Sequence, residues 1–277
     1  MSQAYFLGAN SANGFVGNYA GFCNKDTDYL YVIKGTPGCG KSTFMKKLAQ
    51  AAESSGMQVD RVYCSGDPGS LDAVYFPALN IGYVDGTAPH ITEPSVPGIR
   101  GEYLDFTRYI DFSRLRDAEA KTIAAHKAYK SAYRKAYDHL AVHRRYTAVS
   151  LFGSCRFYRA ITCRGIVSLL LPDEAQPASA QEVAELASRK DCIQYRNPLW
   201  PELIEAVWLP QEKRCICFEP SMPDCQKAVE LLSEAKRYHD ELESCYHQAV
   251  DFSGIDLLLE KHLKKYFSET VVSPEKM

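Results

Sequence analysis

The sequence predicts an α/β fold: two units of mainly parallel sheet, the second a degenerate copy of the first, together with long helices. A run of β-branched and aromatic residues at 29–34 leads through a glycine-rich loop into a helical pattern that ends before Gly56. Residues 71–77, LDAVYFP, recur as residues 204–210, IEAVWLP. Each half also ends in a long helical stretch, at 115–148 and at 224–250.

The glycine-rich loop after residues 29–34 matches the phosphate-binding pattern GxxxxGK[ST], with strand, loop and helix in the required order. The alternative, a chance glycine-rich turn, does not explain why both neighbouring elements are correct. We therefore expect this loop to bind the triphosphate of ATP or GTP together with Mg²⁺. The residues of this candidate site are Gly35, Thr36, Pro37, Gly38, Cys39, Gly40, Lys41, Ser42 and Thr43.

Each residue type in the loop has a physical reason. Gly35, Gly38 and Gly40 let successive backbone N–H groups point at phosphate oxygens, and the helix N-terminus adds the positive end of its dipole. Lys41 is expected to reach the β- and γ-phosphates as the catalytic cation. The Ser42 hydroxyl is expected to ligate Mg²⁺.

A carboxylate at the end of a neighbouring strand usually completes such a magnesium site. Asp85, which ends the strand pattern LNIGYV, is the best candidate for a metal-binding and catalytic role, although it could merely start an Asp-Gly turn. Asp67 and Asp72 follow another strand pattern and are alternatives. His90 follows the turn after Asp85. It is either a contact in the active site or a histidine on a surface loop. Thr43 is expected beside the α-phosphate.

The second half repeats the first. A strand pattern followed by a proline precedes each copy of the recurring segment, and the strand pattern IGYVDG is matched by CICFEP. The opening SANGFVGNY has a fainter counterpart in TCRGIVSLL. We therefore divide the chain into residues 1–150, the unit with the phosphate-binding loop and long C-terminal helices, and residues 151–277, the degenerate copy with its own C-terminal helices.

The second copy has lost its phosphate-binding loop. Residues 166–171 are expected to form its first strand, and the connection that follows, PDEAQPASAQ, contains no GKS. The carboxylates of Asp173 and Glu174 would repel phosphate. The sequence therefore predicts one competent nucleotide site.

The two long helical stretches carry opposite charge. Residues 121–145 contain seven Lys or Arg and one acid, whereas 224–250 is rich in Glu and Asp, which favours packing of the two helices side by side. Alternatively, the basic helix binds a nucleic acid or another anionic partner. Tyr129, Tyr133 and Tyr137 could then stack on bases, although their helical spacing is also typical of a core.

Composition sets further limits. Hydrophobic residues make up 46% of the 277 residues and charged residues 24%, which argues against general disorder. The formal net charge of −2 does not indicate a partner. No window approaches the roughly 18 consecutive apolar residues of a membrane helix, and the first residues lack a signal-peptide pattern. We expect a soluble, cytoplasmic protein without a membrane partner, whose ten cysteines, which include no CxxC pair, are reduced.

The sequence resembles a bacterial family of tandem P-loop proteins, ATPase-like or nucleotide-kinase-like, without a firmly assigned role. The segments that carry the resemblance are ANSANGFVGNY, GTPGCGKSTFMKKL, CSGDPGSLDAVYFPALNIGYVDGTAPH and AKRYHDELESCYHQAVDF. The resemblance implies P-loop NTPase folds in both halves and nucleotide-site roles for residues 35–43 and Asp85. The chain departs from the family because the second half has no Walker-type loop, which leaves only one-site mechanisms.

Three functions are compatible with one such site. The first is slow hydrolysis of ATP or GTP that reshapes the helices, with Asp67 or Asp85 positioning water and Arg61 or Arg100 completing the site. The second is a nucleotide or small-molecule kinase, which needs an arginine-rich lid. The third is a non-enzymatic scaffold gated by nucleotide. The only cluster that could form the lid comprises Arg156, Arg159 and Arg164.

Overall fold

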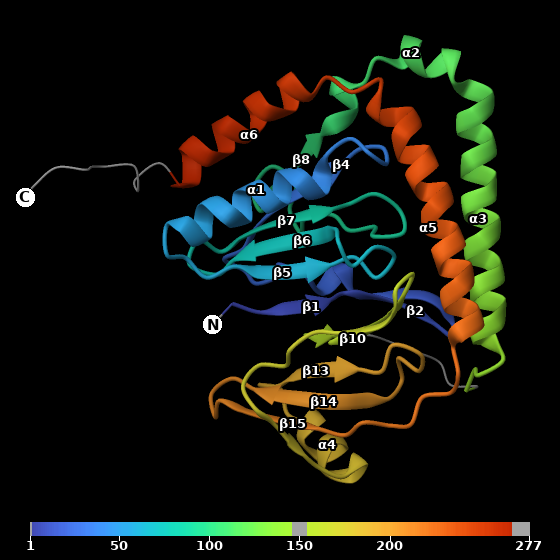
Figure 1. The fold of residues 1–277 in the computed structure, drawn as a ribbon. Helices are drawn as coiled ribbons and strands as arrows, with labels where there is room; N and C mark the ends of the chain where they lie inside the picture. The colour runs from blue at the N-terminus through green and yellow to red at the C-terminus, as the bar shows by residue number, and fades with distance from the viewer. Residues whose placement is uncertain (1, 146–153, 268–277) are drawn as a thin grey trace, which may run out of the picture.

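The computed structural model describes residues 2–145 and 154–267, which form two α/β units and a pair of long helices (Figure 1). The helices run in opposite directions alongside both units, and the second unit lies next to β1 and β2 of the first. The predicted boundary at residue 150 falls between the two described ranges. The chain therefore has the predicted α/β class with a doubled sheet.

The first sheet has six strands in the order β1-β5-β6-β7-β4-β8. The four inner residues of β4 are fully buried, as expected for a central strand. The next helix, α1, places Phe44, Met45 and Leu48 in the core at the predicted helical spacing. The elements are β1 (Ala4–Phe6), β4 (Tyr29–Lys34), α1 (Lys41–Ser54), β5 (Asp60–Tyr63), β6 (Leu71–Phe76), β7 (Ile81–Asp85) and β8 (Gly101–Asp105).

The sheet is mixed: five of its six strands run in the same direction, in agreement with the predicted mainly parallel sheet, and β6 is reversed. β7 and β8 are parallel to β4, but β6 runs antiparallel to both of its neighbours. The reason is the length of the connections: only residues 64–70 and 77–80 separate β5, β6 and β7. Connections of this length join antiparallel neighbours, whereas a parallel pair needs a crossover of a dozen or more residues.

The second sheet repeats the topology of the first. Its order, β12-β15-β14-β13-β9, corresponds to β4-β7-β6-β5-β1, and β14 is reversed as β6 is. The repeated sequence therefore reflects a repeated fold. The elements of the second unit are β9 (Cys155–Arg156), β12 (Ala175–Pro177), α4 (Ala180–Ala187), β13 (Ile193–Arg196), β14 (Ile204–Leu209) and β15 (Arg214–Cys217).

Each unit contains a β-hairpin, and the two hairpins have the same side-chain hydrogen bond in their turns. The Ser11 hydroxyl donates to the carbonyl of Gly14 at 2.7 Å, and the Thr162 hydroxyl donates to the carbonyl of Gly165 at 2.9 Å. The two glycines have φ of +83° and +100°, which side chains rarely adopt. The fainter sequence match between residues 11–19 and 162–170 therefore corresponds to a repeated hairpin. The hairpins are β2 (Gly8–Ser11) with β3 (Gly14–Gly17), and β10 (Arg159–Thr162) with β11 (Gly165–Ser168).

The hairpin corrects the predicted first strand of the second unit. The prediction placed that strand at 166–171, but β11 ends at Ser168 and Leu170 is 91% exposed. The counterpart of β4 is β12, which is parallel to β15 as β4 is to β7. β12 lies inside the segment that was interpreted as a connection, because three residues that include a proline give no strand pattern.

The long helices α3 and α5 pack side by side, as predicted (Figure 1). The Tyr129 ring lies 5.3 Å from the His239 ring, and Tyr133 and Tyr137 border the apolar cluster between the helices. The tyrosines therefore pack and do not form a base-stacking surface. No helix in the described ranges combines the length and apolar character needed to cross a membrane. The remaining helices and 3₁₀ turns complete the list: η1 (Tyr19–Gly21), η2 (Phe106–Tyr109), α2 (Phe112–Asp117), α3 (Glu119–Ala141), α5 (Gln226–His247) and α6 (Phe252–Phe267).

Opposite charge is not what joins α3 to α5. Within the described residues no ion pair connects the two helices, because the acids of α5 pair with bases one turn away on α5 itself, as in Lys236–Asp240 and Arg237–Glu241. The contact is apolar and aromatic. The prediction that the helices pack together was confirmed, but the cause assigned to it was wrong.

The last described helix, α6, returns to the first unit, although the predicted division assigned it to residues 151–277. Ile255, Leu259 and Phe267 join the core that α1 covers. The Nδ1 atom of His262 lies 2.7 Å from the Tyr83 hydroxyl at the centre of the sheet. The first unit is therefore completed by residues from the far end of the chain.

Candidate functional site

The glycine-rich loop lies at the carboxyl end of β4 and leads directly into α1, as predicted. Gly38 and Gly40 have φ of +71° and +87°, and Gly40 is the residue that precedes the first helical turn. These left-handed conformations are available to glycine at little cost and are strained for residues with a Cβ. The two glycines therefore shape the loop.

Backbone amides of the loop are available to a ligand. In the part of the chain that the structure describes, the N–H groups of Gly38 and Gly40 donate to no backbone carbonyl. The first N–H groups of α1 also lack acceptors in their own helix, as at any helix N-terminus. The buried Thr36 Oγ1 has no hydrogen-bond partner. This is the donor arrangement that binds phosphate oxygens.

The Lys41 side chain, 10% exposed, folds back over the loop. Its Nζ donates to the carbonyls of Gly35 at 3.2 Å and Thr36 at 2.8 Å. It also lies 3.5 Å from Oδ2 of Asp85. The ammonium group is therefore held at the loop by two neutral carbonyls. A phosphate, which is negatively charged, can replace them as its partner.

Asp85 ends β7, beside the carboxyl end of β4, because Ile33 and Asp85 are partners in the parallel register. Its Oδ1 accepts a hydrogen bond from the Thr87 amide at 2.8 Å. The Thr87 hydroxyl in turn donates to the Gly35 carbonyl at 3.0 Å, which ties the turn to the loop. The turn that was weighed as an alternative is therefore present, and the carboxylate lies beside the loop as well.

Ser42 and Thr43 lie in the first turn of α1. Ser42 is half-buried, and its Oγ accepts a hydrogen bond from the Leu71 amide at 2.9 Å. That bond uses one lone pair and leaves the hydroxyl able to bind a cation. Thr43 is exposed.

The thiol of Cys39 points into the loop. Its Sγ lies 3.9 Å from Lys41 Nζ, and the residue is fully buried. Burial raises the pKa of this thiol above its ordinary value, although the nearby ammonium opposes the shift. Cys39 therefore supports the shape of the loop as a neutral thiol.

Helix α5 contacts the loop, which the sequence did not indicate. A Cβ on Gly38 would lie 2.6 Å from the backbone carbonyl oxygen of Glu243 on α5, and one on Gly40 would lie 3.4 Å from the ring of Phe252, the first residue of α6. Burial lowers the pKa of His239, one turn earlier on α5, and the Lys41 ammonium adds to this shift. The sequence does place His239 and Glu243 four residues apart, on one face of a helix. Only the acidic composition of this region entered the predictions from the sequence.

The other carboxylate candidates lie nearby but differ in their contacts. Asp67, on the loop after β5, lies 3.6 Å from Arg164 of the second unit and 3.5 Å from Lys236 of α5. Asp72 is buried at the start of β6 and lies 3.5 Å from His90. Asp67 therefore links the first unit to its neighbours, whereas Asp72 and His90 form a separate internal group.

The arginines that were weighed for the site do not converge on it. Arg61 pairs with Glu53 at the far end of α1, and the Arg100 carbonyl accepts from the Leu30 amide at the start of β4, on the edge opposite the loop. A guanidinium in either place cannot reach a γ-phosphate.

Two of the three arginines of the expected lid are engaged elsewhere. The Arg156 guanidinium stacks 3.9 Å from the Tyr5 ring centroid, and Arg159 forms a buried ion pair with Glu205. Arg164 is exposed and lies beside Asp67. The cluster therefore does not form a lid.

The second unit has no comparable loop. Only residues 178 and 179 connect β12 to α4, and Ser179 caps that helix by accepting from the Glu182 amide. The Glu182 side chain closes the capping box. Two residues cannot encircle a phosphate group.

The residues around the loop of the first unit fit a nucleoside triphosphate with Mg²⁺. The amides, Lys41 and the helix dipole suit phosphate oxygens, and Thr36 Oγ1 is a buried polar atom without a partner. Ser42 and Asp85 are oxygen donors of the kind that Mg²⁺ prefers. A scan against models of protein families, a search of curated proteins and a search of solved structures gave no match to this chain.

Proposed function

We propose that this chain binds the triphosphate of ATP or GTP, with Mg²⁺, on residues 35–43, and hydrolyses it slowly. The observation that carries this function is the position of Lys41, whose ammonium lies among loop carbonyls and 3.5 Å from the carboxylate of a neighbouring strand. A triphosphate would replace the carbonyls as the partner of this cation. Asp85 would then be released toward the metal.

The roles follow from the chemistry of each group. The loop amides and Lys41 neutralise charge on the β- and γ-phosphates, and Ser42 and Asp85 hold the metal. Mg²⁺ supplies additional positive charge at the phosphates. Asp67 or Asp85 orients the attacking water. Hydrolysis is expected to be slow, because neither Arg61 nor Arg100 lies near the loop.

A titration with a fluorescent ATP or GTP analogue, with and without Mg²⁺, tests this function. Lys41→Ala removes charge-assisted hydrogen bonds worth about 1.5–3 kcal/mol, so we expect affinity to fall by about 10- to 100-fold. Asp85→Asn should weaken the dependence on Mg²⁺. Lys47→Ala is the matched control, because Lys47 lies on the same helix and forms only an exposed pair with Asp256. Equal affinity in wild type and Lys41→Ala, or equal loss in Lys47→Ala, would remove this site from consideration.

A second candidate, a nucleotide-gated scaffold, is favoured by the contact between Gly38 and the backbone of Glu243. A ligand that reshapes the loop would shift α5, and α5 packs on α3 along their length. Hydrogen exchange of residues 236–247 with and without nucleotide tests this coupling. Release of phosphate at a measurable rate favours the hydrolase. Changed exchange in α5 with negligible turnover favours the scaffold.

A further inference from the structure

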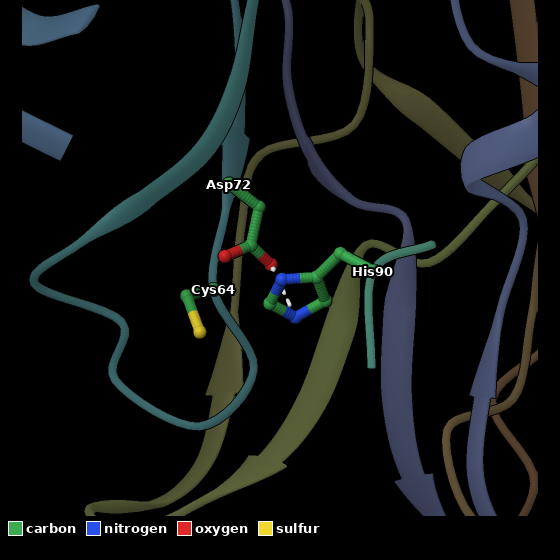
Figure 2. A group of neighbouring side chains, drawn as sticks. All are labelled: Cys64, Asp72 and His90. Carbon is green, nitrogen blue, oxygen red and sulfur yellow. Dashed lines mark ion pairs between the residues drawn. The ribbon is translucent and has the colours of Figure 1, made fainter. Parts of the chain in front are cut away.

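Three side chains that the proposed nucleotide site does not use form a compact group in the first unit. Cys64 follows β5, Asp72 lies near the start of β6, and His90 follows β7. One ligand atom from each lies within 4.8 Å of the others. Figure 2 shows the three side chains close together, with the Asp72 carboxylate beside the His90 ring. The group is at the same edge of the sheet as the phosphate-binding loop.

In the second unit, the carboxylate that corresponds to Asp72 is paired with an arginine, which is always charged. Glu205 is the second residue of β14, as Asp72 is of β6, and is fully buried. The Arg159 guanidinium donates to its two carboxylate oxygens, and the Asn197 amide donates to it at 2.9 Å. Asn197 follows β13 as Cys64 follows β5. The buried carboxylate of the second unit thus has a fixed counter-charge.

The first unit has no such counter-charge among the described residues. Gly8 begins β2 where Arg159 begins β10, and a Cβ on Gly8 would lie 2.9 Å from the Tyr19 hydroxyl. Tyr19 therefore takes the space of an arginine side chain and donates a neutral hydrogen bond to Asp72 at 2.7 Å. Asp72 is 3% exposed, so its charge is largely removed from water. A buried carboxylate in this position requires a cation or a proton.

A protonated His90 is a poor substitute for that cation. Its Nε2 lies 3.5 Å from the Asp72 carboxylate, beyond a good hydrogen bond. Its Nδ1 is buried and has no hydrogen-bond partner.

We propose that Cys64, Asp72 and His90 bind a divalent transition-metal ion of the zinc type. Thiolate, imidazole and carboxylate together form a ligand set that suits zinc and disfavours Mg²⁺. Tetrahedral bonds of about 2.0–2.3 Å require ligand atoms roughly 3.3–3.8 Å apart, so two ligand atoms at the 4.8 Å limit must approach each other by up to about 1.5 Å. The ion would neutralise Asp72 as the Arg159 guanidinium neutralises Glu205 in the second unit. Three protein ligands leave a fourth position for water, as in catalytic zinc sites.

Cobalt titration of the full chain without nucleotide tests this site. One equivalent of Co²⁺ should produce thiolate-to-metal absorption in the near ultraviolet and visible bands of tetrahedral intensity, and Zn²⁺ should displace it. Cys64→Ser should abolish the thiolate band, and His90→Gln should weaken Co²⁺ binding by at least about tenfold. Cys192→Ser is the matched control, because this half-buried thiol of the second unit lies outside the group.

Two results would overturn the site. One is a folded wild-type chain that gives no thiolate absorption with excess Co²⁺. The other is an unchanged spectrum in Cys64→Ser. If either variant does not fold, the wild-type titration still decides, and metal content after purification with added Zn²⁺ provides a second measurement. Because no nucleotide is present, failure here is independent of the proposed nucleotide site.

Discussion

The backbone carbonyl of Glu243 packs against Gly38, so a helix from the far end of the chain touches the glycine-rich loop. Gly38 belongs to the first unit, and Glu243 lies on α5, which follows the second unit. The contact is close enough that a Cβ on Gly38 would lie 2.6 Å from the carbonyl oxygen. The conformation of the loop and the position of α5 are therefore linked.

Gly38→Ala tests this link. The substitution places a side chain at φ +71° and against Glu243, so we expect a loss of about 2–3 kcal/mol in unfolding free energy and faster hydrogen exchange in α5. Gly56→Ala is a matched control, because Gly56 has φ +74° and nothing lies within 4 Å of its Cβ position. The control should lose about 1 kcal/mol and leave α5 unchanged. Equal effects of the two variants would show that the contact contributes nothing.

Stability should fall in mild acid because of His262. Burial lowers its pKa to about 4, whereas the unfolded chain has an ordinary histidine pKa of about 6.5. Between these values the unfolded state binds the proton and the folded state does not, so stability is lost as pH falls from 6.5 to 4. The full loss from this residue is about 3 kcal/mol.

His262→Gln removes the titrating group but retains an acceptor for the Tyr83 hydroxyl. Denaturation midpoints at pH 7, 5.5 and 4.5 should therefore depend less on pH in the variant than in wild type. An identical pH profile would mean that His262 is not the group responsible.

The buried pair of Arg159 and Glu205 gives a third prediction. Arg159→Met leaves a fully buried carboxylate without its cation and should cost about 3–5 kcal/mol in chemical denaturation. The double variant Arg159→Met, Glu205→Gln removes the charge and keeps an acceptor for Asn197, so most of the loss should be recovered. A double variant no more stable than Arg159→Met would show that the ion pair is not the cause.

Cys39 should resist alkylation in the folded protein. The thiol is fully buried, and burial raises its pKa. Reagents attack the thiolate, so both effects slow the reaction. Mass spectrometry after brief iodoacetamide treatment should find Cys39 unmodified in the native chain and modified in denaturant. Rapid native modification would show that the loop opens often.

The sequence predicted those parts of the fold that depend on neighbouring residues. The strand at 29–34, the loop and α1 were predicted with correct boundaries because all their signals lie within 30 residues. The repeat predicted β13 and β15, whose residues match β5 and β7 of the first unit. The short β12 was missed because only its pairing with β15 defines it.

Contacts between distant segments could not be predicted in this way. No local pattern places Glu243 against Gly38 or carries α6 back to the first unit, because both depend on how the two units and the helices pack. The reversal of β6 was predictable, since only residues 77–80 separate it from β7. The group of Cys64, Asp72 and His90 was missed because its members come from three different strand ends.

Calorimetric titration with Mg²⁺ and ATP, and separately with Mg²⁺ and GTP, tests the central claim most directly. The loop amides and Lys41 predict saturable heat at one site per chain for at least one nucleotide, and an affinity about 10- to 100-fold weaker in a folded Lys41→Ala variant. If neither these two nor any other common nucleoside triphosphate produces heat of association with the folded wild-type chain, residues 35–43 are not a nucleotide site.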